Sequence, residues 1–511
     1  MRETALPPGF VMWPDNAAQR NRLCVLISDV HCTDCTVGNQ TASETDWRLF
    51  FDQVEFAVCN PGEKAQISEE QRVDELLLIL NGDILDLIRS AKWAQADVYP
   101  WQRDDPRFAE IVLAIMHDIV DIHARARPPN SKHHYSGFFY WMRKSLDTLR
   151  AQNIAVTIVP IVGNHDKELQ VVPAARRIFY EECLGLGKLD IADSYRAWVA
   201  AQLGVSPDDP YPCMPFYFAD SGLRLLATHG QWRDADNARA TSRWDLCKGW
   251  APQQWREEQY QAFSEPCFGD TVAAAMLSRF IWSTHESIDM TMPGAAHIYK
   301  LLHEMDLYRP SVAAVVRLLR ESRHLARCLP QASGLHDIVL RCFRESLRSW
   351  LGHSATWECA WGSTKIGLIV LSCLSRLRWH WLDMLLMRLM ARAQEPESSI
   401  STCKLLALPA FKREYRALGL RLHVEGHTHA ALAVDLQFPQ TRMGRNNYTY
   451  INLGAWRDTI FLKRNRGHRK RGIGRALFIF DLARLSKKMP NDSYRFYVRD
   501  MTSWGDRLDN C

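Results

Sequence analysis

The sequence predicts an α/β fold that carries large helical insertions. Seven short apolar runs have the length and composition of buried strands. Two longer stretches between them repeat apolar residues with the spacing of amphipathic helices. Directly after each of the first five runs comes a group of polar, metal-capable residues. Because ligands of open α/β sheets lie at strand ends, these groups are the first candidates for a functional site.

The composition is that of an ordinary globular protein with ample material for a core. Of the 511 residues, 47% are hydrophobic and 24% are charged, which are typical fractions. The length exceeds one average domain, although one large α/β domain with insertions also fits it. The 63 basic and 58 acidic residues give a net charge of +5. This near balance does not by itself indicate nucleic acid or a membrane as a partner.

No transmembrane segment is predicted, because no stretch reaches the ~18 uninterrupted apolar residues that a spanning helix needs. The closest stretch is Ile366–Leu389. It is interrupted by Arg376, Arg378, His380, Asp383 and Arg388. A buried or amphipathic helix explains it best. The alternative is a helix that lies on a membrane surface, so peripheral membrane contact stays open.

The cysteine pattern indicates free thiols and a cytoplasmic location. Among 14 Cys, Cys32 and Cys35 form the one C-x-x-C pair, and no second pair follows at zinc-site spacing. Residues Met1–Arg22 lack an apolar core of signal-peptide length. Thiols stay reduced in the cytoplasm. We interpret Cys32 and Cys35 as incidental thiols in a loop, with a redox or metal role as the alternative.

The predicted strands follow an N-terminal extension, residues 1–21, that contains three prolines. Each run is short and apolar, as expected for a strand in the interior of the protein. The predicted strands are Leu23–Ser28, Leu77–Leu80, Ile154–Val162, Leu223–Ala227, Leu420–Val424, Tyr448–Asn452 and Ala476–Phe480.

Two segments of helical character interrupt this strand pattern. The first covers about residues 91–150, inside a first core part that we place at residues 22–239. The second covers residues 240–415 and precedes a second core part at 416–511. Its apolar residues recur at i, i+3, i+4 and i+7 in Ser311–Leu325, Leu335–Leu351 and Trp379–Ala393. We expect residues 240–415 to form a helical insertion or cap on the α/β core.

Five groups of polar residues follow the first five predicted strands in chain order. They are Asp29-Val30-His31, Gly82-Asp83-Ile84-Leu85-Asp86, Gly163-Asn164-His165-Asp166, Thr228-His229-Gly230 and Gly426-His427-Thr428-His429. Carboxylate, imidazole and amide oxygen together favour Mn, Fe, Zn or Co and argue against an all-oxygen Mg or Ca site. One D-x-H or H-x-H arises by chance, but five such groups in this order predict a metal site.

The spacing within two groups suggests how they share an ion. In a strand, residues i and i+2 point to the same side. Asp29 and His31 can therefore approach one ion together, as can His427 and His429 if their segment is extended. The neighbouring glycines permit sharp turns and close backbone approach.

Together the five groups resemble the signature of the calcineurin-like metallophosphoesterase superfamily, which runs D-x-H, G-D-x-x-D, G-N-H-D/E, H and G-H-x-H. The likeness covers about residues 22–90, 150–237 and 420–482 and leaves both helical insertions unexplained. It implies a metallophosphoesterase-type four-layer α/β/β/α sandwich with two metals at the strand ends. It also implies two divalent ions as cofactors, manganese first, with iron, zinc, nickel or cobalt as alternatives.

The resemblance assigns a role to each matching residue. The first metal is expected to be bound by Asp29, His31 and His429. The second is expected to be bound by Asn164, His229 and His427, and Asp83 bridges both. His165 takes the position of the catalytic histidine, and Asp86 that of the carboxylate that orients it. A water shared by two ions ~3.5–4 Å apart becomes hydroxide and attacks phosphorus, while His165 stabilises the phosphoryl oxygens or protonates the leaving group.

Residues just after His229 are candidate substrate contacts. Arg233, Asp234 and Asn237 lie near the second metal in sequence. Arg233 either clamps a phosphate bidentately or is a surface residue in a turn. Asp166 either forms hydrogen bonds within its loop or contacts the substrate or His165.

A basic run occupies Lys463–Arg475 and contains three glycines, which favours a hairpin loop. A solvated loop is the simpler interpretation. The functional one is attraction to polyanions such as nucleic acid or anionic lipid. The run lacks the interleaved aromatic residues of a base-stacking surface.

The predicted function is a dinuclear-metal-dependent hydrolase of phosphate monoesters or diesters. Gly82–Leu87 and Tyr450–Trp456 resemble the branch with UDP-2,3-diacylglucosamine pyrophosphohydrolases, which has arginine where this chain has His165. A nuclease and a non-catalytic metal-binding scaffold are the alternatives. The sequence leaves open whether the 240–415 insertion is a lid that excludes water, a dimer interface or a membrane-facing element.

Overall fold

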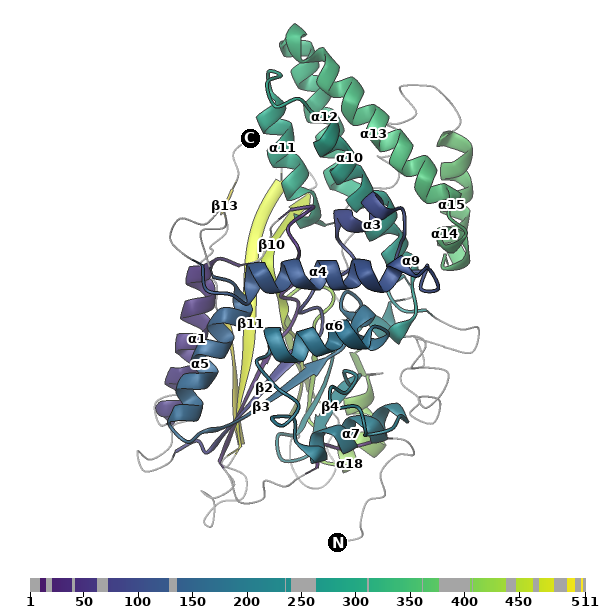
Figure 1. Cartoon of the computed structure of the whole chain (residues 1–511). Coiled ribbons are helices and arrows are strands. Elements are labelled where there is room, and N and C mark those ends of the chain that lie inside the picture. The colour runs from purple at the N-terminus through teal and green to yellow at the C-terminus, as the bar shows by residue number, and fades with distance from the viewer. Residues whose placement is uncertain are drawn as a thin grey trace.

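The computed structural model of the chain shows a mixed α/β fold with two β-sheets, so the predicted α/β class is confirmed (Figure 1). The structure describes residues 10–14, 21–38, 42–61, 72–127, 136–234, 236–239, 263–309, 312–360, 362–375, 405–406, 408–437, 447–462, 468–481, 494–500 and 507–508.

The larger sheet is mixed and has the strand order β3-β2-β1-β11-β10-β6, with β12 and β13 also paired to β11. Its strands are β1 (Arg22–Ile27), β2 (Glu75–Asn81), β3 (Ala155–Ile161), β6 (Tyr308–Arg309), β10 (Gly454–Leu462), β11 (His468–Asp481), β12 (Tyr494–Asp500) and β13 (Arg507–Leu508). The first three strands are parallel, so their carboxyl ends meet at one edge. Strand β6 belongs to the 240–415 segment and pairs with β10, which joins that segment to the sheet.

The smaller sheet has the order β4-β5-β7-β9-β8. Its strands are β4 (Tyr217–Asp220), β5 (Leu225–Thr228), β7 (Leu422–Glu425), β8 (Leu432–Gln437) and β9 (Asn447–Asn452). Strands β5, β7 and β9 are parallel. The side chain of Asn81 donates to the carbonyl of Thr228 at 3.1 Å. This bond links the carboxyl end of β2 in one sheet to that of β5 in the other.

All seven predicted strands are found, six of them within a few residues of their predicted bounds, while Ala476–Phe480 is the second half of the longer β11 (His468–Asp481). The strands that sequence reasoning missed include β4, β8, β10 and β12. They are antiparallel partners, and β8, β10 and β12 interleave charged residues with apolar ones. A strand of only four residues such as β4, or one that interleaves charged with apolar residues, gives no long continuous apolar run, which is the signal that found the others.

Helices cover the sheets and supply most of the first insertion. They are α1 (Glu44–Cys59), α3 (Ala91–Ala96), α4 (Arg107–His123), α5 (Phe138–Ala151), α6 (Pro173–Ile178) and α7 (Asp193–Leu203). Helix α1 begins with a capping box between Ser43 and Asp46 and packs beside α5 (Figure 1). The helical character predicted for residues 91–150 is found in α3, α4 and α5.

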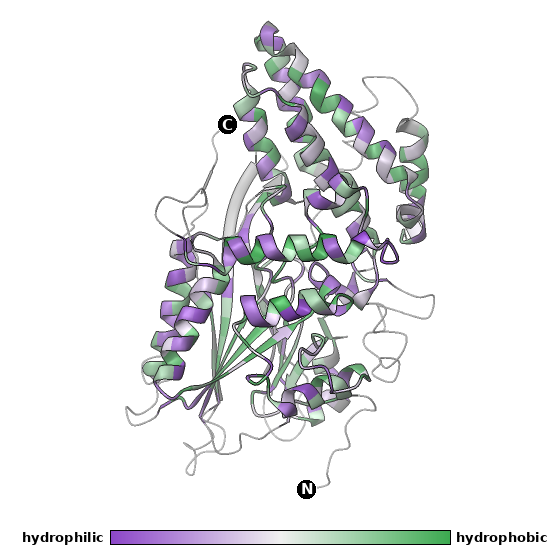
Figure 2. Ribbon diagram, viewed as in Figure 1, coloured by the Kyte–Doolittle hydropathy of each residue, from purple (hydrophilic) through white to green (hydrophobic). Residues whose placement is uncertain are grey.

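Within residues 240–415 the described elements are mainly helical; most of them lie at one end of the molecule, whereas the last, α18 (Arg413–Ala417), lies near the other end (Figure 1). The main ones are α9 (Phe268–Asp270), π-helix η6 (Thr271–Ser278), α10 (Arg279–Ser287), α11 (Ala295–Glu304), 3₁₀-helix η7 (Met305–Leu307), α12 (Val312–Cys328), α13 (Ser333–Gly352), α14 (Ser354–Glu358), α15 (Gly362–Ser375) and α18 (Arg413–Ala417). Helices α12 and α13 match two predicted amphipathic segments; the third, Trp379–Ala393, lies outside the described residues. Apolar and polar residues alternate along α12 and α13, as amphipathic helices require (Figure 2).

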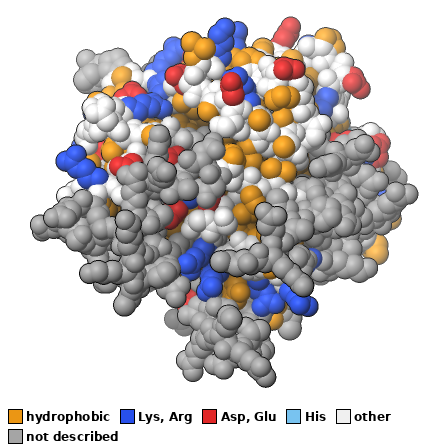
Figure 3. Space-filling view, turned by 90° about the horizontal axis from the view of Figure 1, so that it is seen from below, with side chains coloured by type: hydrophobic (Ala, Val, Ile, Leu, Met, Phe, Trp, Pro, Cys, Tyr) orange, Lys and Arg blue, Asp and Glu red, His pale blue; other side chains and the backbone are white. Residues whose placement is uncertain are grey.

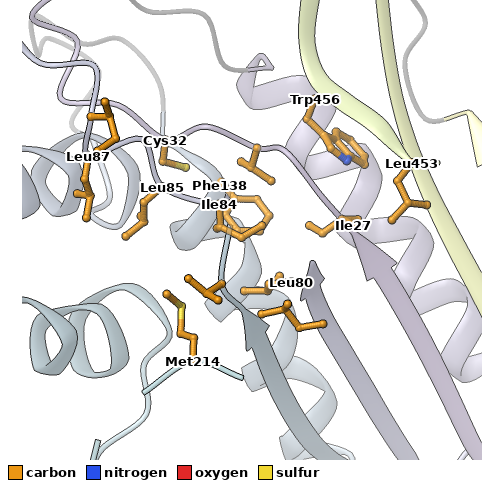
Figure 4. Packing of buried hydrophobic residues seen from close by; sticks show 14 of the residues in the cluster. Ile27, Cys32, Leu80, Ile84, Leu85, Leu87, Phe138, Met214, Leu453 and Trp456 are labelled. Carbon is orange, nitrogen blue, oxygen red and sulfur yellow. The ribbon is translucent and has the colours of Figure 1, made fainter. Parts of the chain in front are cut away.

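A layer of apolar side chains lies beneath the strand ends (Figure 4). Ile27 and Leu80 end two parallel strands and are fully buried. Ile84 and Leu85 belong to the loop that follows β2, and both are buried as well. Burying each such side chain contributes roughly 1.5–3 kcal/mol. The polar loops at the strand ends therefore lie on a close-packed apolar layer.

Three further predictions concern the chain as a whole. In the described part of the chain, no helix combines the length and apolar character needed to cross a bilayer. Helix α15 exposes Ile366, Ile369 and Val370, and peripheral membrane contact stays a prediction.

The described cysteines, Cys32 and Cys35 among them, are free thiols. In the N-terminal extension, Phe10 is buried and stacks on Tyr217 with ring centroids 5.2 Å apart.

Candidate metal centre

The five polar groups converge where the two sheets meet. Asp29 follows β1, and its backbone amide donates to the carbonyl of Gly82 beyond β2 at 3.0 Å. The amide of Gly426 beyond β7 donates to the carbonyl of His229 beyond β5 at 2.9 Å. The amide of His427 donates to both carboxylate oxygens of Asp29, at 3.1 and 3.0 Å. Loops that are hundreds of residues apart in sequence therefore form one site.

Within this site, three sets of side chains bring metal-capable atoms within 4.8 Å of one another. The sets are Asp29 with His31 and His429, then Asp83 with His229 and His427, and third His31 with Asp83 and His165. The first two sets hold six of the seven predicted metal ligands. His31 and Asp83 each belong to two sets, so the sets are joined into one cluster.

The backbone at these residues is left-handed. Asp29, His31, Asp83, His427 and His429 have φ angles of 55°, 52°, 51°, 66° and 57°. Non-glycine residues adopt this region at a cost, and a cluster of them is typical of a functional site. Asp29 and His31 do fall in one set, as predicted, but not through an extended backbone, and the extended segment on which the pairing of His427 with His429 depended is absent. Left-handed turns, not the two-residue repeat of a strand, aim these side chains at the centre.

Two histidines are oriented by partners on their outer nitrogen. Nδ1 of His31 lies 3.0 Å from Oδ2 of Asp86, and Nδ1 of His229 lies 2.9 Å from the carbonyl oxygen of Asn81. Both oxygens accept, which favours a proton on each Nδ1, so that Nε2 would be the nitrogen offered to a bound metal. Among the described residues, Nε2 of His229 is buried without a hydrogen-bond partner, although Oδ2 of Asp83 is 3.1 Å away. An imidazole nitrogen and a carboxylate oxygen at this distance fit two ligand atoms of one metal ion.

Two glycines leave room for the carboxylates. A Cβ atom on Gly163 would lie 2.1 Å from Oδ1 of Asp83, and one on Gly426 would lie 2.1 Å from Oδ2 of Asp29. Contacts this short are excluded, so any larger residue would displace a candidate ligand. The glycines of the G-N-H-D and G-H-T-H motifs are thus required by the close approach of Asp83 and Asp29.

The cluster concentrates buried negative charge that favours a cation. Burial raises the pKa of Asp29, and the nearby Asp83 charge raises it further. Burial disfavours the charged form of His229, but the charges of Asp83 and Asp29 outweigh it and raise the pKa of His229 to about 10. In the metal-free protein a proton on His229 therefore partly neutralises the two carboxylates. A divalent ion in the same place would replace that proton.

His165 and Asp86 form a pair beside the cluster. Nδ1 of His165 donates to Oδ1 of Asp86 at 2.8 Å. Burial opposes ionisation of Asp86, yet the charge of Arg89 and the hydrogen bonds from His165 and His31 hold its pKa well below the usual range. The imidazole of His165 is partly exposed, with 19% of its side chain accessible, whereas Asp86 is fully buried. Asp86 thus orients both His165 and the candidate ligand His31.

The predicted ligand Asn164 lies beside His427. Oδ1 of Asn164 is 3.0 Å from Nδ1 of His427, and Oδ2 of Asp234 is 3.1 Å from Nε2 of the same ring. Asp234 also accepts from the side chain of Asn237 at 2.7 Å. The structure therefore places Asp234 against a candidate ligand, with Asn237 behind it. Their roles as substrate contacts stay predictions.

Arg233, the predicted phosphate clamp, is engaged inside the protein. Its guanidinium forms a bidentate ion pair with the buried carboxylate of Glu425, through Nε at 3.0 Å and through Nη2. The charge of Arg233, with hydrogen bonds from His423, overcomes burial and lowers the pKa of Glu425 to about 2. A phosphate would have to compete with this ion pair, so the clamp role stays a prediction. Asp166 accepts from the amides of Gly163, in its own loop, and Ile84 at 2.6 and 3.2 Å.

Sequence reasoning missed two buried arginines beside the cluster. Arg89 forms an ion pair with Asp86, and its Nη2 is 3.1 Å from Nδ1 of His31. Nη2 of Arg457 is 3.4 Å from Nδ1 of His429. Burial lowers the pKa of each guanidinium to about 10, so both stay charged at neutral pH. The available sequence signals were weak: Arg89 follows Asp86 by three residues, and Arg457 follows the Tyr450–Trp456 segment.

The predicted basic loop, Lys463–Arg475, is shorter than expected. Strands β10 and β11 form the predicted hairpin, but β11 begins at His468, so much of the run is strand. Residues 463–467 lie outside the described residues.

Comparison of the chain with protein-family models, with curated proteins and with solved structures finds no match.

Proposed function

We propose that the protein is a metal-dependent hydrolase of phosphate esters that binds two divalent ions and belongs to the calcineurin-like metallophosphoesterase superfamily. The observation that carries this proposal is that Asp83 lies in one set with His229 and His427 and in another with His31 and His165, while His31 is also shared with the set of Asp29 and His429. One set of three donors fits one ion. Two sets joined by a carboxylate fit a dinuclear centre.

Each candidate ligand has a defined part in this proposal. Oδ2 of Asp83 faces Nε2 of His229 at 3.1 Å and Nε2 of His31 at 3.9 Å, so one oxygen lies between both sets. Asp29, His31 and His429 would hold the first ion. Asn164, His229 and His427 would hold the second. Bound ions would supply Lewis acidity and lower the pKa of a coordinated water.

The catalytic part of the proposal belongs to His165. Because Nδ1 of His165 is held by Asp86, Nε2 is the nitrogen left to face the substrate. His165 can then donate a proton to the leaving oxygen or stabilise the phosphoryl oxygens, a contribution of roughly 10²–10⁴-fold for general acid catalysis.

The finer fold and the metal identity belong to the same proposal. Two mixed sheets with helices against them agree with a metallophosphoesterase-type four-layer sandwich. The donors are imidazole nitrogen, carboxylate oxygen and amide oxygen, which suit manganese, iron, zinc, nickel or cobalt better than magnesium alone. Manganese is the first ion to test.

The nuclease alternative has weaker support. It depends on the basic run, of which residues 463–467 lie outside the described residues. On the face seen in Figure 3, the visible lysine and arginine side chains form separate groups interspersed with acidic and apolar ones. A polynucleotide track would need a continuous basic surface. This face therefore gives the nuclease alternative no specific support, and a phosphate monoester or diester stays the leading substrate in the proposal.

Hydrolysis assays test the proposal directly. Protein stripped of metal would be given Mn, Zn, Ni or Mg and then a chromogenic phosphomonoester or phosphodiester. We expect metal-dependent release of the chromophore, and loss of release in Asp83→Asn. Folded protein that binds two ions but hydrolyses neither ester, nor any member of a broader phosphoester panel, would favour the non-catalytic scaffold.

A further inference from the structure

A pocket next to the candidate metal centre is lined by two cations and by apolar side chains. The cations are the guanidinium groups of Arg89 and Arg457, and the wall also includes the candidate ligand His31. The apolar part of the lining is Val37, Leu277, Ile281 and Met305. Leu277, Ile281 and Met305 belong to the 240–415 segment, so the pocket lies between that segment and the α/β core.

The two arginines share one acceptor. Nη1 of Arg457 donates to Oδ2 of Asp306 at 2.6 Å, and Nη1 of Arg89 contacts the same oxygen. The side chains of Arg89 and Arg457 are 7% and 2% exposed. Two buried cations this close repel each other strongly unless an anion lies between them. In this structure Arg89 is paired with Asp86 of the core, and the anion that both guanidinium groups share is Asp306 of the 240–415 segment.

The carboxylate of Asp306 contacts Nη1 of each arginine, and other nitrogens of the two guanidinium groups are left without an acceptor in the described part of the chain. Among the described residues, Nε of Arg89 and Nε of Arg457 are buried without a hydrogen-bond partner. A phosphoryl group has three terminal oxygens, carries up to two negative charges and matches the fork of a guanidinium. It would satisfy more of these donors than one carboxylate does.

We propose that Arg89 and Arg457 form a binding site for a phosphoryl group that is not itself hydrolysed, and that Asp306 occupies this site until the ligand displaces it. The site adjoins the first set of candidate ligands. Nη2 of Arg89 contacts Nδ1 of His31, and Nη2 of Arg457 contacts Nδ1 of His429. This inference rests on the proposed phosphoesterase function. The inference implies that the substrate carries a second phosphoryl group besides the one that is hydrolysed.

The charge on Asp306 makes the proposal testable without turnover. Asp306→Asn removes the anion that the two arginines share; Arg89 keeps its ion pair with Asp86, and both guanidinium groups still line the pocket. Inorganic phosphate, titrated by calorimetry into chelator-treated protein, should then bind at least ~10-fold more tightly than to the wild type. Absence of metal removes the other phosphate site, so the result is independent of whether the protein is a hydrolase.

Two further variants test whether a gain in phosphate affinity comes from this site or from weaker packing of the 240–415 segment against the core. Asp270→Asn breaks another buried ion pair of that segment, in which Asp270 contacts Lys167 of the core at 2.5 Å, and should leave phosphate affinity unchanged. Adding Arg457→Gln to Asp306→Asn should abolish the gain. Equal affinity in Asp306→Asn and the wild type, or a gain that survives Arg457→Gln, would overturn the proposal.

Hydrogen exchange on the wild-type chain provides a second measurement if Asp306→Asn does not fold. Phosphate that displaces Asp306 should accelerate amide exchange in residues 305–309 of the metal-free protein. Unchanged or slower exchange there, at phosphate concentrations that saturate binding, would contradict the displacement.

Discussion

The backbone amide of His165 donates a 2.8 Å hydrogen bond to Oδ1 of Asp83. The carboxylate proposed to bridge the metals thus also fixes the loop that carries the proposed catalytic histidine. Its other oxygen, Oδ2, faces the imidazole nitrogens of the two ligand sets. Metal binding and the position of His165 are therefore coupled through one side chain.

Replacing Asp86 should weaken both metal binding and catalysis. Asp86→Asn removes the charge that orients His31 and His165. We expect metal affinity to fall about 10–100-fold, as for other carboxylates behind a ligating histidine, and kcat to fall at least as much. Metal titration and kinetics measure the two effects. The matched control is Asp220→Asn, a buried carboxylate paired with Arg22; equal loss of metal affinity in both variants would refute the role of Asp86.

Enlarging Gly163 should displace the bridging carboxylate. The new methyl group of Gly163→Ala would lie 2.1 Å from Oδ1 of Asp83, and such overpacking costs about 1–3 kcal/mol. We expect lower metal content, measured by elemental analysis, and a lower Tm. Gly367→Ala is the control, because a methyl group there meets nothing within 4 Å and the change favours the helix by up to about 1 kcal/mol. Full metal content in Gly163→Ala would argue against this geometry.

Metal affinity should rise with pH because the ion replaces a proton on His229. The pKa of His229 is raised to about 10 in the metal-free protein, from its ordinary value of 6.5. The stability that this proton contributes is fully present below pH 6.5 and is lost as the pH rises toward 10. We therefore expect apparent metal affinity to increase about tenfold per pH unit between pH 6.5 and 8.5 for each proton released.

Competition binding with a metal indicator across this pH range measures the slope. His123→Asn serves as the control, because His123 is buried but bonds the carbonyl of Thr33 rather than a candidate ligand. Its slope should match that of the wild type. A flat affinity profile would mean that His229 does not carry the competing proton.

The ion pair of Arg233 with Glu425 should matter for stability more than for substrate binding. Arg233→Gln leaves the fully buried Glu425 carboxylate without its cation. Breaking a buried ion pair lowers the free energy of unfolding by about 3–5 kcal/mol. Because 21% of the Arg233 side chain is exposed, we expect a loss at or below the lower end of this range. Denaturant unfolding should show the loss, with KM nearly unchanged in folded enzyme. A raised KM at unchanged stability would support the phosphate clamp instead.

The predictable parts of the fold and site were those encoded locally. Parallel buried strands such as β2 are continuous apolar runs, and the ligands follow such strands within a few residues. The G-N-H-D motif is informative because its glycine, amide and imidazole are adjacent in sequence. The strands missed by sequence reasoning, such as β12, alternate apolar and charged residues and depend on a distant partner for pairing.

The unpredictable parts depend on long-range geometry. Asp306 has no local motif, yet it contacts Arg89 and Arg457, which are 217 and 151 residues away in sequence. The left-handed backbone at His427 and His429 is likewise invisible in a pattern that an extended strand would also satisfy. Neither feature follows from residue type or spacing, because both arise where separate loops meet.

The most direct test of the central claim is metal content measured together with hydrolysis, in the wild type and in His165→Ala. We predict two equivalents of a divalent ion per chain in both proteins and metal-dependent cleavage of a chromogenic phosphoester by the wild type. His165→Ala should keep its metals and lose roughly 10²–10⁴-fold in rate. Fewer than two ions in the folded wild type, or unchanged turnover in His165→Ala, would contradict a dinuclear phosphoesterase with His165 as its catalytic histidine.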